Sequence, residues 1–431
     1  MMKNIWNSIL VLAATGVLVL ACSKNKDDDT PPGEANTLEI TSFAPLTQEV
    51  GKTVTITGKN FATTTSGNVV QFNGVNASLN SATATQLVAV VPNGDVDGKI
   101  KVTVGTETAT SIKDFTLAIP EPQGPSVYVA GRGYDNSKAI AMFWKDGQVT
   151  FLTDGENEAG ARSIAVREDG VVYNAGFESL NNTNQAKVWI DDDEILLTDG
   201  QNEAIANSIF LAGTDYYVTG FEEEDGRFIA KVWKNGKEYD SYTFDETSDT
   251  FGESIYVSGT DLYVAGYQVV DGYEYARVWK NGEPIYLEHI NSNDARALSV
   301  YVEGDDVYVA GHEFNLDPYN YIARAWENGE VILSTDAEYH AYAHSIMTAD
   351  SDTYIAGDEN NQAVLWVNAE PKILSGGEKA FSVYVYDNDV FVAGYGDYGE
   401  ETAGFVWKND EEPIELLGGD GSTYANAVYV K

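Results

Sequence analysis

The chain has 431 residues, of which 26 are Lys or Arg and 67 are Asp or Glu, so its formal net charge is −41. A protein that binds nucleic acid needs a basic face to displace the counterions of the phosphates, and no run of basic residues longer than a pair occurs in this sequence. A nucleic-acid partner is therefore excluded, and so is a scaffold of disulfides or Cys-ligated metals, because Cys22 is the only cysteine.

Residues 1–21 have the features of a targeting segment. Lys3 precedes an apolar run over 9–20, and the small residue Ala21 directly precedes Cys22. The run is too short to span a membrane as a stable helix. The segment resembles bacterial lipoprotein signal peptides, and the resemblance implies that Cys22 becomes the lipidated first residue of the mature protein. An ordinary signal peptide with an incidental Cys is the alternative.

Residues 22–36 are charged and Pro-containing and have nothing to bury, which predicts an acidic, flexible tether. The acidic triplet at 27–29 resembles the export signal of Bacteroidota surface lipoproteins. This resemblance implies a protein of the outer membrane that faces the cell exterior, whereas the alternative is a plain polar spacer. An acidic surface is repelled by anionic headgroups, so the lipid anchor would have to supply the membrane attachment.

Residues 37–118 predict a small antiparallel β-sandwich. Apolar and polar residues alternate at 54–57 and 100–104, and glycines follow at turn spacings. The segments that resemble the IPT/TIG family of immunoglobulin-like domains are ITSFAP (40–45), GKTVTITGKNF (51–61), VQFNGV (70–75) and VP (91–92). The resemblance implies a stalk or interaction module without chemistry of its own. Residues 119–125 contain three Pro and predict a semi-rigid linker at a domain boundary.

Residues 126–431 consist of repeats. A glycine-ended strand recurs at 127–131, 172–176, 216–220, 262–266, 307–311, 353–357 and 390–394. A tryptophan recurs as Trp144, Trp189, Trp233, Trp279, Trp326, Trp366 and Trp407, at spacings of 40–47 residues. This period is typical of a β-propeller blade and predicts seven blades.

Each repeat predicts four strands, and the fourth repeat shows them best, at 254–257, 262–266, 276–279 and 284–287. Asn281-Gly282 supplies the positive φ of a two-residue hairpin between the last two strands. The first repeat begins at its second strand, while 427–431 match a first strand. We therefore expect an all-β chain, with an immunoglobulin-like β-sandwich followed by a seven-bladed β-propeller that the C-terminal strand closes.

The variable residues are predicted on one face of the propeller. The turns between strands one and two and between strands three and four are short and uniform, so the other loops share the opposite face. Two adjacent loops supply the candidate binding residues Tyr267, Tyr273, Tyr275, His312, Phe314, Tyr319 and Tyr321. Aromatic rings among Asp, Asn and Glu suit stacking on sugars with hydrogen bonds to hydroxyls. The alternative is that these rings pack the loops onto the blades.

Catalytic and metal-binding patterns are weak. His340 and His344 are four residues apart but precede a strand rather than lie on a helix, so the spacing loses its metal-binding meaning. A cluster of these two with His312 remains open. The turns at 153–159 and 198–204 are acidic enough to hold a hard cation, although solvated turns are the simpler interpretation. We expect no catalytic residue, no cofactor and no metal.

These patterns predict a non-catalytic binding module on the outer-membrane surface. The resemblance to Bacteroidota lipoproteins that place such a stalk before a recognition domain makes a glycan the favoured ligand. An adhesion or protein-interaction scaffold with an envelope protein as partner is the first alternative. A propeller-type polysaccharide lyase or hydrolase is the second, and in either case a monomer is expected.

Overall fold

The computed structural model describes residues 37–118, 124–135, 138–244, 247–289, 294–399, 401–418 and 421–431. The predicted signal segment, Cys22, the tether and most of the linker lie outside these residues. The chain divides into two compact units between residues 121 and 122. Apart from the single-turn 3₁₀ helix η1 (Thr65–Gly67), every described element is a β-strand, which confirms the all-β prediction.

The first unit is the predicted sandwich. One sheet has the order β1 (Glu39–Ala44), β3 (Thr53–Lys59), β7 (Gln86–Val90) and β6 (Leu79–Ala82). The other has the order β2 (Thr47–Gln48), β9 (Glu107–Leu117), β8 (Gly98–Val104), β4 (Val69–Phe72) and β5 (Val75–Ala77). Alternate residues of β3, Val54 and Ile56, are fully buried between the sheets, and Phe72 meets Phe115 edge-on at 4.8 Å.

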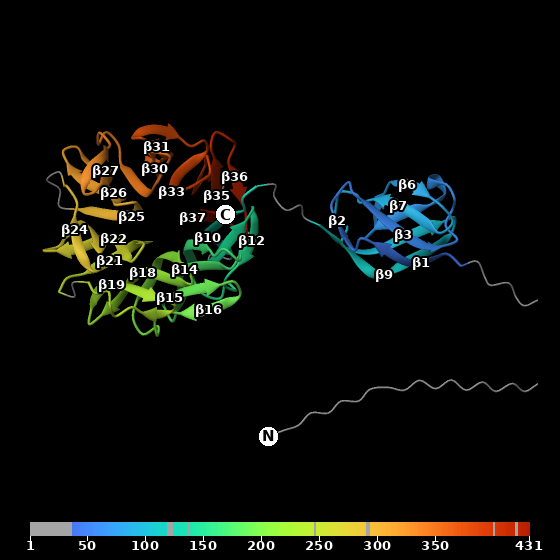
Figure 1. Cartoon of the computed structure of the whole chain (residues 1–431), viewed down its shortest axis with the longest axis horizontal. Coiled ribbons are helices and arrows are strands. Elements are labelled where there is room, and N and C mark those ends of the chain that lie inside the picture. Colours follow the sequence, from blue (N-terminus) through green and yellow to red (C-terminus); the bar gives the residue numbers. More distant parts are fainter. Residues whose placement is uncertain are drawn as a thin grey trace, which may run out of the picture. The chain divides into compact units, whose positions relative to one another are not determined.

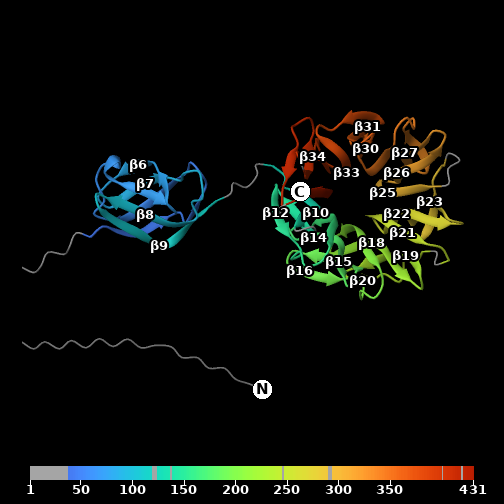
Figure 2. The same cartoon turned by 180° about the vertical axis from the view of Figure 1, so that it is seen from behind.

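The second unit consists of seven four-stranded sheets, which form a ring (Figures 1 and 2). From the innermost strand outward, blade 1 is β37 (Thr423–Val430), β10 (Val127–Asp135), β11 (Lys138–Lys145) and β12 (Gln148–Phe151). Blade 2 is β13 (Ala159–Val166), β14 (Val172–Leu180), β15 (Thr183–Ile190) and β16 (Asp193–Leu196), and blade 3 is β17 (Ala204–Ala212), β18 (Asp215–Glu224), β19 (Arg227–Lys234) and β20 (Lys237–Glu238).

The remaining blades have the same order. Blade 4 is β21 (Thr250–Ser258), β22 (Asp261–Val270), β23 (Tyr273–Lys280) and β24 (Glu283–Tyr286), and blade 5 is β25 (Ala295–Glu303), β26 (Asp306–Leu316), β27 (Tyr319–Glu327) and β28 (Glu330–Ser334). Blade 6 is β29 (Ala341–Ala349), β30 (Asp352–Glu359), β31 (Gln362–Val367) and β32 (Glu370–Ile373), and blade 7 is β33 (Gly377–Tyr386), β34 (Asp389–Tyr398), β35 (Glu401–Lys408) and β36 (Ile414–Leu416).

Blade 1 is built from both ends of the propeller sequence, as predicted. The C-terminal strand β37 pairs with β10 in antiparallel register, with Tyr429 opposite Tyr128. The side-chain amide of Asn426 donates to the carbonyl of Ala161 in β13 at 2.8 Å, which ties the last strand to blade 2 as well. The C-terminal strand therefore closes the ring through its own sheet and through the next one.

The turn between strands three and four is bonded to the start of strand two in every blade. In blade 4, Asn281 has φ 52° and Gly282 φ 88°, the left-handed pair that a type I′ hairpin needs. The side-chain oxygen of Asn281 also accepts the N–H of Leu262, the second residue of β22, at 2.9 Å. The same bond recurs in all seven blades, through Asp146, Asp191, Asn235, Asn281, Asn328, Asn368 and Asn409.

The second and third strands extend further than the sequence predicted. β22 and β23 continue to a two-residue turn, Asp271-Gly272, whose φ angles are 54° and 82°. The expectation that the candidate binding residues lie in loops is therefore wrong. Tyr267, Tyr273 and Tyr275 are strand residues of blade 4, and His312, Phe314, Tyr319 and Tyr321 are strand residues of blade 5. The prediction ended the strand at its glycine and did not extend the hairpin signal to this Asp-Gly pair.

Each innermost strand carries a β-bulge after a small residue. The extra residues are Arg162, Asn207, Glu253, Leu298, His344, Phe381 and Asn426. The glycine of strand two lies opposite the bulge, and a Cβ added to Gly266 would lie 1.8 Å from the carbonyl oxygen of Phe251. This close approach of two backbones is the physical reason why a glycine recurs at this position of strand two.

The residue after the bulge is Ser in six blades, and it bonds to the next blade. The Oγ of Ser254 accepts the N–H of Val300 at 3.2 Å. The same bond is made by Ser163, Ser208, Ser254, Ser299, Ser345 and Ser382. Because the innermost strand is a sheet edge, this N–H has no partner within its own sheet. At the seventh junction the position is occupied by Ala427, which has no hydroxyl.

We expect Ser254→Ala to lower the free energy of unfolding by about 1–3 kcal/mol, because it leaves the buried N–H of Val300 without an acceptor. Ala427→Ser, which adds the missing hydroxyl beside Ile164, is expected to raise it by about 0.5–1.5 kcal/mol. Chemical unfolding of both variants measures these changes. Equal stability of the two variants and the wild type would show that the serine bonds do not contribute to ring closure.

Candidate ligand-binding site at the channel mouth

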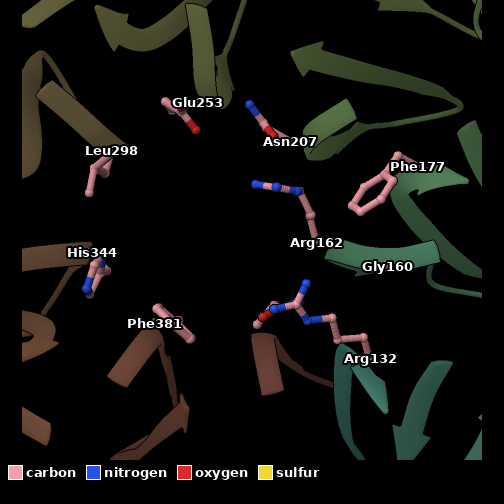
Figure 3. Close-up of a pocket in the computed structure, with 10 residues that line it drawn as sticks. Arg132, Gly160, Arg162, Phe177, Asn207, Glu253, Leu298, His344 and Phe381 are labelled. Atoms are coloured by element: carbon pink, nitrogen blue, oxygen red, sulfur yellow. The ribbon is translucent and has the colours of Figure 1, made fainter. Parts of the chain in front are cut away.

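The seven bulge residues face a common cavity of about 320 Å³ inside the ring (Figure 3). The wall also includes Gly160 from β13 and, from two second strands, Arg132 and Phe177. In Figure 3, Arg132 and Arg162 extend into the opening from one side, and His344 and Phe381 border the other. The cavity lies towards the ends of the blades where strands two and three are joined, which is the face that the sequence predicted to be variable.

The two guanidiniums in the cavity contact rings rather than carboxylates. Arg132 lies over Tyr424 at 5.2 Å and over Tyr134 at 5.8 Å, and Arg162 lies over Phe177 at 5.7 Å. Among the described residues, neither forms an ion pair within 4 Å. Both therefore retain hydrogen-bond donors that can reach a ligand.

Burial and mutual interaction shift the pKa values of the ionisable groups in the cavity. Burial within the ring lowers the pKa of Arg162, the carboxylate of Glu253 raises it, and neighbouring Arg132 lowers it. Burial raises the pKa of Glu253, which Arg162 and Arg296 partly oppose. The cavity thus has a cationic side and an acidic group that is weakly held in its charged form.

A continuous row of rings borders half of the mouth. Its members are Tyr319, Phe314, Tyr321, Tyr342, His344, Phe381, Tyr395, Tyr424 and Tyr134, from blades 5, 6, 7 and 1, and consecutive centroids are 4.7–6.1 Å apart. We call this row the aromatic arc. None of its members is fully buried, and two of them, His344 and Phe381, line the cavity.

A histidine and an aspartate are paired at the wall of the cavity. The Nε2 of His344 lies 2.8 Å from Oδ1 of Asp358, and the Nζ of Lys379 is 3.9 Å from the other oxygen of the same carboxylate. Asp358 is 3% exposed and lies between these two groups. This pair can orient His344 towards a bound ligand as a hydrogen-bonding group or as a base.

The buried amide of Asn207 adds a polar group to the opposite wall. Its nitrogen donates to the carbonyl of Gly252 at 2.8 Å. Its oxygen is buried and, within the described residues, has no partner. A ligand hydroxyl that reached this oxygen would satisfy it.

The structure separates the predicted binding residues into three groups. Tyr319, at 72% exposed, lies in the aromatic arc together with Phe314 and Tyr321. His312 is 8% exposed and packs behind the arc, against Tyr321 at 5.2 Å.

The remaining three predicted residues lie in blade 4, away from the arc. Tyr267 is 6% exposed and stacks on Phe251 at 4.6 Å, so it belongs to the blade packing. Tyr273 is exposed, and Tyr275 packs near His289 at 6.4 Å. Among described residues, no ring contact joins these three to the predicted residues of blade 5.

Apart from His344, which was weighed only as a metal ligand, the bulge residues could not be singled out from the sequence, although a signal for them exists. Six repeats contain a small residue, one variable residue and then Ser, as in Ala161-Arg162-Ser163. The variable position points into the channel only because of the bulge. In a regular strand, side chains alternate between the two faces of the sheet, and an inserted residue changes this alternation. The direction of the variable side chain could therefore not be predicted from alternation.

The proposed three-histidine cluster does not form. His340 accepts the N–H of Tyr321 through Nδ1 at 3.1 Å, and His344 pairs with Asp358. Among the residues that the structure describes, no three His, Cys, Asp or Glu side chains are grouped so as to hold a metal ion.

The described part of the chain contains no helix that is long and apolar enough to cross a membrane.

Comparison with known proteins identifies the first unit. Residues 38–117 match the IPT/TIG domain family, which confirms the resemblance seen in the sequence. No curated protein matches the chain.

The chain is also similar to several solved structures, all at low identity. An auxiliary nutrient binding protein from Bacteroides thetaiotaomicron has 12% identity and a TM-score of 0.35, over 87% of this chain and 99% of that one. A related auxiliary nutrient binding protein from Bacteroides ovatus has 12% identity and a TM-score of 0.29, over 88% and 99%. A surface glycan-binding protein from Prevotella bryantii has 12% identity and a TM-score of 0.19, over 43% and 53%.

We expect His312 to make the propeller sensitive to acid. Burial lowers its pKa to about 3, so the folded protein holds it neutral. Its contribution to stability is present above the unfolded pKa of about 6.5 and is lost as the pH falls towards the folded value. At pH 5 this loss is about 2 kcal/mol.

His312→Phe keeps a ring at this position and removes the titration. The unfolding free energy of the variant should therefore fall less than that of the wild type between pH 7.5 and pH 5. The comparison uses the slope with pH, because the substitution can shift both curves by a constant amount. Parallel curves would contradict the assignment of the acid sensitivity to His312.

Proposed function

We propose that this protein is a surface lipoprotein whose propeller binds a glycan at the channel mouth. The observation that carries the proposal is the aromatic arc beside a polar cavity of about 320 Å³. This volume is within the range of small-molecule sites, about 300–1,000 Å³. A sugar presents one apolar ring face and several hydroxyls, and the mouth offers a matching surface to each.

The arc would supply the stacking surface and the cavity wall the polar contacts. Phe381 borders the cavity directly and packs between His344 at 5.1 Å and Tyr395 at 5.6 Å. A pyranose that lies on Phe381 would have its hydroxyls within the same cavity as His344 and Asn207. Both side chains can form hydrogen bonds with hydroxyl groups.

The position at the cell surface is part of the same proposal. Its support is the apolar run that ends at Cys22 and the acidic tether that follows it. A lipid on Cys22, together with the tether and the IPT/TIG domain, would hold the propeller away from the membrane. The acidic surface of the chain favours this arrangement, because it disfavours contact with anionic headgroups.

A hydrolase or lyase is the second candidate, and the pair of His344 with Asp358 is the observation that favours it. A histidine held by a buried carboxylate at the wall of a cavity is an arrangement that general bases use. Incubation of the protein with a polysaccharide panel, followed by analysis of the products, separates the two. New reducing ends or unsaturated products that disappear in His344→Gln would identify an enzyme.

We expect the pair of substitutions Phe381→Leu and Tyr319→Ala to weaken glycan binding by about 1–3 kcal/mol in total, the scale of aromatic contacts at an interface. Both residues belong to the aromatic arc. Tyr273→Ala is the matched control, since Tyr273 is 43% exposed but lies outside the arc. Calorimetric titration measures the affinities. An equal loss in the control would place the ligand on the blade 4 rim instead.

We expect Cys22→Ser to release the protein from the membrane in soluble form, because the lipid would have no attachment site. Fractionation of cells followed by immunoblotting measures the distribution. Protease added to intact cells should degrade the wild-type propeller if the protein faces outward. A variant that remains bound to the membrane would contradict the lipid anchor.

A further inference from the structure

We propose that the glycan bound at the channel mouth carries an acidic group, a carboxylate or a sulfate ester, which is held between Arg132 and Arg162. This inference rests on the proposed glycan-binding function and names the chemical class of the ligand. It is drawn from the partners of the charged groups around the mouth and from the shape of the cavity beside Gly160.

The other cations around the mouth already have carboxylate partners. Arg296 binds Glu274 through two hydrogen bonds of 2.5 and 2.6 Å, and Lys379 lies 3.9 Å from Asp358. Arg132 and Arg162 differ, since neither forms an ion pair within 4 Å among the described residues and both lie over ring faces; Arg162 interacts with the carboxylate of Glu253 only at longer range. Ring contacts leave the N–H groups at the edge of a guanidinium available for an anion.

This arrangement is unusual for the composition of the chain. Acidic residues outnumber basic ones by 67 to 26, so carboxylates are plentiful as partners for any arginine. Two guanidiniums that line one cavity repel each other, and Arg132 lowers the pKa of Arg162 in this way. An anion bound between them would relieve it, whereas a neutral ligand would leave it in place.

The wall of the cavity beside the arginines carries a glycine where the other blades have a side chain. The inner strand of the other blades has a side chain at the position two residues before the bulge, and these side chains are Ile205, Phe251, Arg296, Tyr342, Lys379 and Tyr424. Blade 2 has Gly160 there. A Cβ on Gly160 would lie 3.3 Å from the ring of Phe177 and 3.8 Å from Cδ of Arg132. The ring of Phe177 and the side chain of Arg132 therefore pack against the bare backbone of Gly160, which itself lines the cavity.

The acidic group is expected on a sugar rather than on a free inorganic ion. The cavity is larger than an inorganic ion requires, and the aromatic arc reaches Tyr424, which Arg132 itself contacts. A planar carboxylate or a sulfate matches the forked donors of a guanidinium. A ring attached to that group would extend from the arginines onto the arc.

Glu253 makes the charge dependence of the site testable in both directions. It lines the same cavity, and although burial raises its pKa, its carboxylate would repel an acidic ligand at a pH at which it is ionised. Glu253→Gln should therefore strengthen the binding of an acidic glycan, while Arg162→Gln should weaken it. Arg167→Gln is the matched control, because Arg167 pairs with Asp169 at the turn between β13 and β14, which belongs to the opposite face of the ring.

The test titrates the mature protein with three oligosaccharides of equal length, namely oligogalacturonate, its fully methyl-esterified form and a sulfated galactan fragment. The esterified form keeps the sugar rings and removes the charge. We expect an acidic oligosaccharide to bind at least tenfold more tightly than the esterified one, and Arg162→Gln to remove most of this difference. The preference should also fall as salt is raised. The two acidic arms distinguish a carboxylate from a sulfate ligand.

Each outcome decides a different point. Binding of the esterified and acidic forms with equal affinity, unchanged in Arg132→Gln and Arg162→Gln, would overturn the acidic-ligand inference and leave the glycan-binding function intact. An equal loss in Arg167→Gln would assign the effect to overall charge, and it would overturn the inference too. Failure of all three probes and of a neutral glycan panel to bind would overturn the proposed function itself.

Discussion

The close approach of the first two strands of every blade is the constraint on which the rest of the propeller depends. The bulge moves a carbonyl of the inner strand to within 1.8–2.1 Å of where a Cβ of the strand-two residue would be, so that residue is Gly131, Gly176, Gly220, Gly266, Gly311, Gly357 or Gly394. The same bulge places the following serine against the next blade and turns one side chain into the channel. Three consecutive residues, namely the small residue, the bulge residue and the serine, therefore produce both the bond to the next blade and the lining of the cavity.

Because other residues form the contacts between strands and between blades, the residue at the bulge position can vary. The glycine of strand two is present in all seven blades and the serine in six, whereas the bulge residue differs from blade to blade. It is Arg162 in blade 2, Glu253 in blade 4 and Phe381 in blade 7. Seven similar blades thus form a mouth with two unlike sides, aromatic along blades 5, 6, 7 and 1 and cationic where blades 1 and 2 meet. A glycan with an acidic group has the same two features.

Periodicity was sufficient to predict the architecture but not the site. The tryptophan spacing and the turn at Asn281-Gly282 reflect interactions within a blade, which repeat with the sequence, so the strands and the closing role of β37 could be predicted. The cavity depends on which side of a strand a residue faces after a bulge, and one inserted residue reverses that side. Arg162 was missed for this reason, while Tyr319 and Phe314 were named as candidates because they lie near the hairpin between strands two and three, and their role in binding stays a prediction. Tyr267 was placed at the surface because its burial depends on Phe251, a contact between neighbouring strands.

The most direct test of the site is a crystal structure of the mature protein with bound oligogalacturonate. In that structure, we expect one uronate carboxylate between the guanidiniums of Arg132 and Arg162, beside Gly160. We also expect a sugar ring against Phe381 or Tyr424 of the aromatic arc. An oligosaccharide bound on the opposite face of the ring or on the IPT/TIG domain, with the channel mouth empty, would contradict the central claim.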